Sequence, residues 1–144
     1  MICPRPTPSR NLFAGEPSAR RCLPFDNPVS ALRDIADAVD SIQQFTEGMD
    51  FEAFRQDLKT IAAVERKLLV ISEAAIRLKE DAAKLCPGLP WPEIRGIGNW
   101  LRHQYDRVDL ETLWNTLQDD LPPLSASVRR ALSNPPTKDS TPEP

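Results

Sequence analysis

Long apolar runs are missing from this 144-residue chain. No stretch approaches the roughly 18 residues that cross a bilayer, and no apolar segment follows the N-terminal arginines. Neither contact with a membrane nor a secretion signal is therefore expected. The three cysteines, Cys3, Cys22 and Cys86, form no C-x-x-C pair. Their spacing predicts no disulfide framework and no zinc site, and it favours a reducing, cytoplasmic setting.

Histidine occurs once and glycine five times, and the motifs that depend on them are absent. There is no P-loop, no G-x-G-x-x-G after a strand, no H-E-x-x-H and no nucleophile elbow. The sequence predicts neither a protein-bound transition metal nor a cofactor. Asp34, Asp37 and Asp40 recur every third residue. We interpret these carboxylates as a solvated stripe on a helix, with a Mg²⁺ site as the weaker alternative.

An excess of positive charge is missing too, since 18 lysines and arginines stand against 21 aspartates and glutamates. This balance excludes a protein that coats nucleic acid through its overall charge, so any anion binding must be local.

Prolines mark the two ends of the chain: six of the 15 lie in residues 1–28 and four in residues 133–144. Proline-rich ends without apolar periodicity do not bury a core. The sequence therefore predicts one helical domain over residues 28–132 and a disordered tail over 133–144. Residues 1–27 are predicted to be a disordered extension, or the result of a start codon placed too far upstream. A basic RNA-binding arm is the alternative for this extension.

Apolar residues recur every three or four positions between these ends, and nowhere do they alternate as in a strand. Asn27 and Pro28 predict the start of a first helix, and Gly48 its end. Asp50 is a predicted N-cap. The apolar residues that follow it and share one helical face are Phe51, Phe54 and Leu58.

The strongest periodicity runs from Ile61 to Leu78 and predicts a helix that ends before Cys86. Residues 91–104 form a third segment, and Asp109 is the predicted cap of a last helix. Pro122-Pro123 must kink or break that last helix. Short connections between amphipathic helices predict an all-α, antiparallel bundle of four or five helices.

A dense polar cluster surrounds the single histidine. In a helix over 91–104, Gly96 and Gly98 are poor helix formers, which favours close approach of another backbone or a substrate. Arginine binds phosphate bidentately, and imidazole exchanges a proton near neutral pH. The alternative is a solvated helix face with two ordinary glycines. The polar residues that fall on one face, at i, i+4, i+7 and i+8, are Arg95, Asn99, Arg102 and His103.

Several short segments, in order along the chain, carry a resemblance to a known family. They are Phe45-Thr46-Glu47-Gly48-Met49 with Phe51, Ile71-Ser72-Glu73-Ala74-Ala75, Leu89-Pro90-Trp91, His103-Gln104-Tyr105, Val108-Asp109-Leu110, Trp114 and Asp120-Leu121-Pro122. In these segments, over about residues 30–132, the chain resembles the HepT-like family of HEPN-domain proteins, the toxin halves of prokaryotic toxin–antitoxin pairs.

The resemblance implies a homodimeric α-helical endoribonuclease that cleaves tRNA or mRNA without a metal. Its motif is R-x4-6-H, often extended to H-x-Y, in which His103 matches the histidine and Asn99 the polar residue after the arginine. It also implies a partner, a small nucleotidyltransferase antitoxin that silences the toxin by adding AMP to the tyrosine. Tyr105 matches that AMP acceptor.

The chain departs from this motif at one position, because the arginine expected five residues before His103 is Gly98. Arg95 and Arg102 are the candidates to hold the phosphate instead. A non-catalytic HEPN module, which binds a nucleotide, RNA or a partner without cutting, is the alternative function. The excess of acidic residues in 28–132, 17 against 13 basic, also favours that alternative over tight, non-specific RNA binding. A purely structural helical adaptor would leave the polar cluster unexplained.

Overall fold

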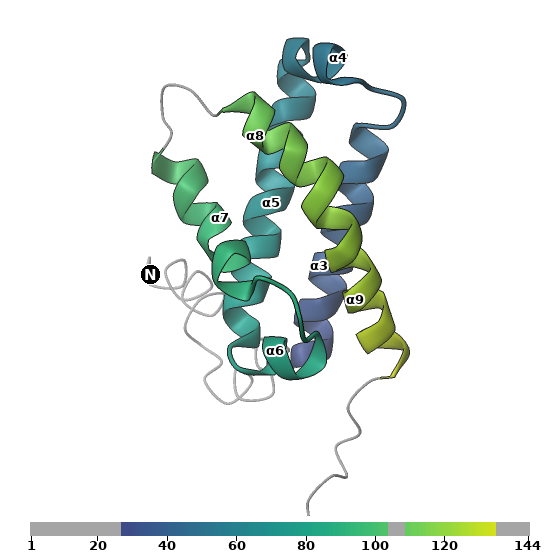
Figure 1. The fold of residues 1–144 in the computed structure, drawn as a ribbon, viewed down its shortest axis with the longest axis vertical. Helices are drawn as coiled ribbons and strands as arrows, with labels where there is room; N and C mark the ends of the chain where they lie inside the picture. The colour runs from purple at the N-terminus through teal and green to yellow at the C-terminus, as the bar shows by residue number, and fades with distance from the viewer. Residues whose placement is uncertain (1–26, 104–108, 135–144) are drawn as a thin grey trace, which may run out of the picture.

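The computed structural model describes residues 27–103 and 109–134, and within these ranges the regular elements are helices (Figure 1). In chain order they are α3 (Pro28–Phe45), α4 (Phe51–Gln56), α5 (Leu58–Leu78), α6 (Asp81–Leu85), α7 (Trp91–His103), α8 (Leu110–Asn115), the π-helical turn η2 (Thr116–Asp120) and α9 (Leu121–Ser133). The predicted all-α fold is confirmed. The boundaries predicted at residues 27 and 133 stay predictions, because most of both ends lies outside the described ranges. Across those ranges, no helix has the length and apolar character needed to span a membrane.

The long helix α5 lies at the centre of the bundle. It packs against α3 on one side and α7 on the other, and α3 in turn packs against α9. In Figure 1 the α8–η2–α9 segment runs along the front of the bundle, and α4 and α6 lie at opposite ends. The helix α7 stands at the edge of the bundle and packs mainly against α5. Its placement therefore depends on what holds it to α5.

The core is built from the positions at which the apolar periodicity is strongest. The six apolar positions that make up the predicted periodicity are all buried: Ile61, Val64, Leu68, Ile71, Ala75 and Leu78. Phe54 is fully buried, and its ring centroid lies 5.0 Å from that of Trp114. Leu58 was predicted to share the face of Phe54, and that prediction is wrong, since Leu58 is 78% exposed. The reason is that Asp57 ends α4 and begins α5, which breaks the helical phase between them.

Side-chain caps start the helices where the sequence predicts them. Asn27 accepts a hydrogen bond from the amide of Val29 and precedes Pro28, the first residue of α3. Asp50 caps α4 by accepting from the amide of Ala53. Gly48 has a φ of +74° in the turn after α3, three residues beyond its end at Phe45. The first helix thus ends earlier than predicted, with Thr46 as its C-cap, and Gly48 supplies the left-handed conformation in the turn that follows.

The cap of the longest helix makes part of the stability depend on pH. Hydrogen bonds from the Thr60 amide and hydroxyl lower the pKa of Asp57 below its ordinary value of 3.8. A lowered folded-state pKa contributes stability that is present above pH 3.8 and is lost as the pH falls through the folded value. We expect Asp57→Asn, which still caps a helix but does not titrate, to reduce the fall in Tm between pH 5 and pH 2. Thermal unfolding followed by circular dichroism at both pH values measures this, with Asp37→Asn as the control. An equal fall in the wild type and Asp57→Asn would contradict the expectation.

The helix predicted to end before Cys86 ends at Leu78, the last residue of the predicted periodicity, and a second, short helix lies between it and Cys86. Lys79, the C-cap of α5, has φ 51° and ψ −129°, and the short helix α6 follows it. A side chain is unfavourable in this backbone conformation, which glycine adopts readily. A local reversal at Lys79 thus separates two helices where the sequence pattern indicates one.

Lys79→Gly is expected to stabilise the fold by about 1 kcal/mol, because it removes the cost of holding a side chain at positive φ. Urea unfolding of the wild type and the variant measures the change. Lys79→Ala keeps a Cβ and serves as the control that should gain nothing. A gain of the same size in Lys79→Ala would mean that the lysine side chain, not the backbone conformation, is unfavourable.

The predicted break at Pro122-Pro123 takes the form of a π-helical turn just before the prolines. The amide of Leu121 donates to the carbonyl of Thr116, five residues earlier. The two prolines then lie in the first turn of α9, where a missing N–H leaves no intrahelical bond unmade.

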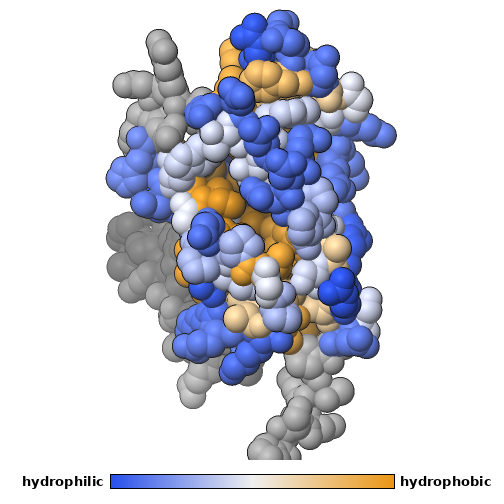
Figure 2. Space-filling view, viewed as in Figure 1, coloured by the Kyte–Doolittle hydropathy of each residue, from blue (hydrophilic) through white to orange (hydrophobic). Residues whose placement is uncertain are grey.

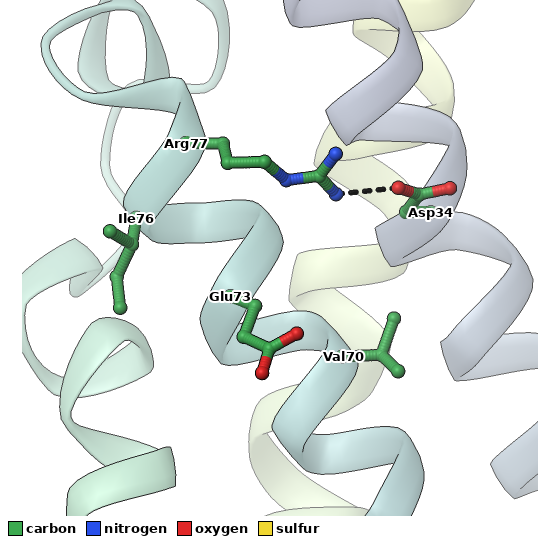
Figure 3. Close-up of a pocket in the computed structure, with 5 residues that line it drawn as sticks. All are labelled: Asp34, Val70, Glu73, Ile76 and Arg77. Carbon is green, nitrogen blue, oxygen red and sulfur yellow. Dashed lines mark hydrogen bonds and ion pairs between the residues drawn. The ribbon is translucent and has the colours of Figure 1, made fainter. Parts of the chain in front are cut away.

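Two of the three carboxylates on α3 form ion pairs with arginines of neighbouring helices. The prediction of a purely solvated stripe is corrected for these two. Arg77 of α5 donates to Asp34 at 2.5 Å, as the dashed line in Figure 3 shows, and Arg129 of α9 donates to Asp40. Asp37 remains exposed. Within residues 27–103 and 109–134 no group of three or more His, Cys, Asp or Glu residues is arranged to hold a metal ion.

Candidate functional site

The end of α7 carries the residues predicted to act on phosphate. His103 is the last residue of the helix, and its side chain is exposed, as are those of Arg102 and Asn99. Ile94, on the predicted core side, is buried. The helical arrangement inferred from the sequence therefore holds for these residues, and an imidazole, a guanidinium and an amide are open to solvent within the last two turns.

Gly98 lies on a different side of α7, in close contact with α5. It is buried, and its amide donates to Oγ of Ser72 at 3.2 Å. A Cβ at position 98 would lie only 3.0 Å from that Oγ, closer than ordinary van der Waals contact. The sequence predicts that another backbone or a substrate approaches these glycines, and at Gly98 the close neighbours are side chains of α5 instead. Among the residues that the structure describes, nothing lies within 4 Å of a Cβ at Gly96, so no backbone approaches there, and the approach of a substrate stays a prediction.

Arg95 is half-buried and directed to the C-terminal end of α5. Its Nε donates to the carbonyl of Ala75 at 3.2 Å, and its Nη2 donates to the carbonyl of Lys79 at 2.6 Å. A guanidinium there satisfies carbonyls that the helix leaves unpaired and lies favourably at the negative end of the helix dipole. The bonds that the structure gives Arg95 are those of a helix cap, and its part in phosphate binding stays a prediction.

Distance along α7 also separates Arg95 from the histidine. His103 is eight positions after Arg95, which corresponds to about 12 Å of helix rise. Arg102 is next to His103 and is exposed. Of the two candidate cations, Arg102 is therefore the better placed to share a phosphate with the imidazole. Tyr105, the predicted AMP acceptor, lies outside the described residues.

The role of Ser72 was not predicted from the sequence. Ser72 was named only as a member of the segment Ile71-Ser72-Glu73-Ala74-Ala75, which carries part of the family resemblance. Ser72 is 2% exposed, and its hydroxyl bonds to the backbone of α7. Two features of the sequence could have indicated this contact: a serine within the apolar stripe of α5 and a glycine within α7. A small polar residue at a core position needs a hydrogen-bond partner, and a glycine allows a close neighbour.

One hollow, of about 540 Å³, is lined by Trp91, Pro92 and Arg95 of α7 together with Lys79, Glu80, Ala83 and Leu89. An open hollow of about 510 Å³ lies over α3 and α5, and Figure 3 shows Asp34, Val70, Glu73, Ile76 and Arg77 along it. The buried thiol of Cys86 donates to the carbonyl of Ser127 at 3.6 Å, and burial raises its pKa. Cys86 is thus an unreactive core residue.

The face of the molecule that carries α7 is not uniformly polar. In the orientation of Figure 1, apolar side chains gather in a recess near the middle of the face, between α7 and the α8–η2–α9 segment, and polar residues surround them (Figure 2). Partly buried apolar residues packed against the core include Ile97, Trp100 and Leu101 of α7. An apolar recess with a polar rim is typical of a surface that binds another protein.

The sequence matches the family described as Ribonuclease HepT-like over residues 35–131. This match covers most of the helical bundle, including α7 and His103. The chain therefore belongs to the HepT-like ribonuclease family.

Relatives of known name agree with the family. The chain is 38% identical over 99 residues to "Probable ribonuclease HepT" of Thermococcus cleftensis, an alignment that covers 69% of this chain and 90% of that protein. It is 33% identical over 103 residues to "Putative RNase MJ0125" of Methanocaldococcus jannaschii, which covers 72% of this chain and 89% of that protein. No solved structure matches the chain significantly.

Proposed function

We propose that this protein is a metal-independent endoribonuclease and the toxin of a toxin–antitoxin pair. The observation that carries the proposal is the exposed pair of Arg102 and His103 at the end of α7, in a chain whose relatives are named as ribonucleases. A guanidinium binds the phosphate, and an imidazole next to it transfers protons. Asn99, one turn earlier on the same face, is proposed to hydrogen-bond the substrate.

The proposed reaction needs two proton transfers. One imidazole takes the proton of the ribose 2′-hydroxyl as its oxygen attacks the neighbouring phosphorus. The bond from phosphorus to the 5′ oxygen breaks, and a second imidazole gives that oxygen a proton. The guanidinium of Arg102 stabilises the negative charge that develops on the phosphate oxygens. The products are a 2′,3′-cyclic phosphate and a 5′-hydroxyl.

A homodimer supplies the second imidazole, because the chain has one histidine. In a twofold dimer His103 of each protomer faces one shared cleft, so one acts as base and the other as acid. The apolar recess on the face that carries α7 supports such an interface (Figure 2). Light scattering of the purified protein measures its mass, and a monomer at the concentration of the cleavage assay would contradict the two-imidazole reaction.

The test of the ribonuclease is cleavage of total tRNA in the presence of EDTA. We expect the wild type to cut under these conditions and to leave ends with a 2′,3′-cyclic phosphate. Loss of cleavage in EDTA, restored by a divalent ion, would contradict the metal-independent reaction.

Tyr105→Phe is expected to abolish silencing by a nucleotidyltransferase antitoxin while leaving RNA cleavage within about twofold of wild type. The proposed antitoxin moves AMP from ATP to the phenolic oxygen, with release of pyrophosphate, and phenylalanine lacks that oxygen. The added phosphate blocks the cleft by bulk and by like-charge repulsion. The measurement incubates the wild type or Tyr105→Phe with ATP and the proposed nucleotidyltransferase antitoxin, and follows the intact mass of each protein. A mass increase of one AMP on Tyr105→Phe would place the modification elsewhere.

One observation favours a second function, a module that binds RNA or a nucleotide without cutting. The arginine expected in the family motif is absent at position 98, and the structure uses that position for contact with Ser72. A dimeric wild type that binds RNA in a gel-shift assay but leaves it uncut would favour this second function.

A further inference from the structure

Ser72 joins the two helices on which the proposed site depends. Its hydroxyl donates to the carbonyl of Arg95 at 2.7 Å and accepts from the amide of Gly98 at 3.2 Å. In the part of the chain that the structure describes, the buried polar side chains are those of Ser72 and Ser125. Because one hydroxyl bonds two points of α7, it fixes how far that helix slides and how far it rotates on α5.

The position of His103 follows from this contact. The imidazole is exposed, and α7 packs mainly against α5, so His103 lies where α7 places it. Gly98 is five residues before His103, about 7.5 Å along the helix. A small rotation of α7 at Gly98 therefore moves the imidazole and Arg102 together.

We propose that Ser72 is a positioning residue for His103. The inference rests on the proposed function, in which two copies of His103 and the neighbouring Arg102 act on one phosphate. Reacting groups displaced by about 1 Å can lower a rate by about a hundredfold. By this proposal, Ser72 does not touch RNA, and it acts by holding the Arg95–Gly98 turn of α7 against α5.

Two substitutions together separate positioning from packing. In Ser72→Ala/Gly98→Ala both hydrogen bonds are lost, and the Oγ that a Cβ at position 98 would meet at 3.0 Å is removed. The remaining neighbours, Cβ of residue 72 and Cδ2 of Leu69, would lie 3.5 Å from the new Cβ, an ordinary contact. This double variant therefore keeps the two helices packed, and alanine suits the interior of α7 better than glycine.

The kinetic measurement compares kcat, KM and Tm of the wild type, Ser72→Ala and the double variant. We expect the double variant to recover the wild-type Tm, to keep KM within about twofold and to lose about tenfold in kcat. Ser125→Ala is the matched control, since it removes the other buried serine hydroxyl, which accepts from Nε of Arg129 on α9. We expect its kcat to stay at the wild-type value. A double variant with wild-type kcat and Tm would overturn the positioning role.

A second measurement does not depend on RNA cleavage. The chain has one histidine, so its imidazole gives one Cε1–H signal in a ¹H–¹³C spectrum, and that signal needs no assignment by mutation. Ser72→Ala changes no residue of α7, and we expect it to shift the imidazole signal and the amide signals of residues 101–103, whereas Ser125→Ala leaves them in place. Unchanged signals in Ser72→Ala would overturn the proposal. If the signals shift in Ser72→Ala but the wild type cuts no RNA, Ser72 does place His103, and the proposed ribonuclease activity is overturned instead.

Discussion

His103→Ala is expected to lower the rate of RNA cleavage by at least about a hundredfold, the largest effect of any single substitution proposed for this protein. In the proposed reaction both protons pass through the imidazole of His103, one in each protomer, so alanine removes base and acid at once. The measurement is the rate of tRNA cleavage in EDTA under single-turnover conditions, at equal concentrations of the wild type and the variant.

Folding and dimerisation are expected to survive this change. The side chain of His103 is exposed at the end of α7, and exposed substitutions usually change stability by less than about 0.5 kcal/mol. An unchanged Tm and mass therefore show that lost cleavage reports on chemistry. Cleavage at the wild-type rate by His103→Ala would contradict the mechanism and move attention to the other residues of the polar cluster.

Gly98→Arg is expected to destabilise the fold by about 3 kcal/mol, even though it restores the residue that the family motif calls for at this position. The new Cβ would lie 3.0 Å from Oγ of Ser72, and the rest of the side chain would carry a charge into a buried contact. For a domain of this size the cost corresponds to a fall in Tm of roughly 12 °C or more. Thermal and urea unfolding measure both quantities.

The matched control is Gly96→Arg, two residues earlier on the same helix. A Cβ at Gly96 has nothing within 4 Å, so the substitution gains helix propensity, up to about 1 kcal/mol, and buries no charge. The two arginine variants should thus differ in sign. A wild-type Tm for Gly98→Arg would contradict the expectation and mean that α7 can move away from α5 to admit the arginine. Faster RNA cleavage by the same variant would mean that the glycine at position 98 lowers the activity of the wild type.

The parts of the fold that depend on residues close together in the chain were predictable from the sequence. The caps at Asn27, Asp50 and Asp109 and the apolar stripe of α5 follow from short-range chemistry, and the structure confirms them. The division of helices at Asp57 and at Lys79 was not predictable in the same way. At Asp57 the spacing of Phe54 and Leu58 continues one helical face across the break, and at Lys79 the backbone adopts a positive φ at a residue type that gives no sign of it.

The candidate site was predictable in part for the same reason. Helical spacing places Asn99, Arg102 and His103 on one exposed face, and the structure agrees. Helical spacing shows which residues share a face of α7, but not which other helix that face contacts. It therefore could not reveal that Arg95 bonds to the end of α5. Nor could it pair Ser72 with Gly98, which are 26 residues apart in the chain.

The π-helical turn η2 has a consequence for how the chain aligns with its relatives. A π turn holds about one residue more than an α turn, so an extra residue is accommodated without rotating the helix that follows. A relative with one residue fewer between Leu113 and Leu124 can run through this stretch as continuous α-helix and still bury both leucines, which are core residues here. A sequence alignment can therefore place a gap of one residue within Thr116–Asp120 while the core stays unchanged. Such a gap lies inside a helix, where alignments ordinarily penalise gaps most.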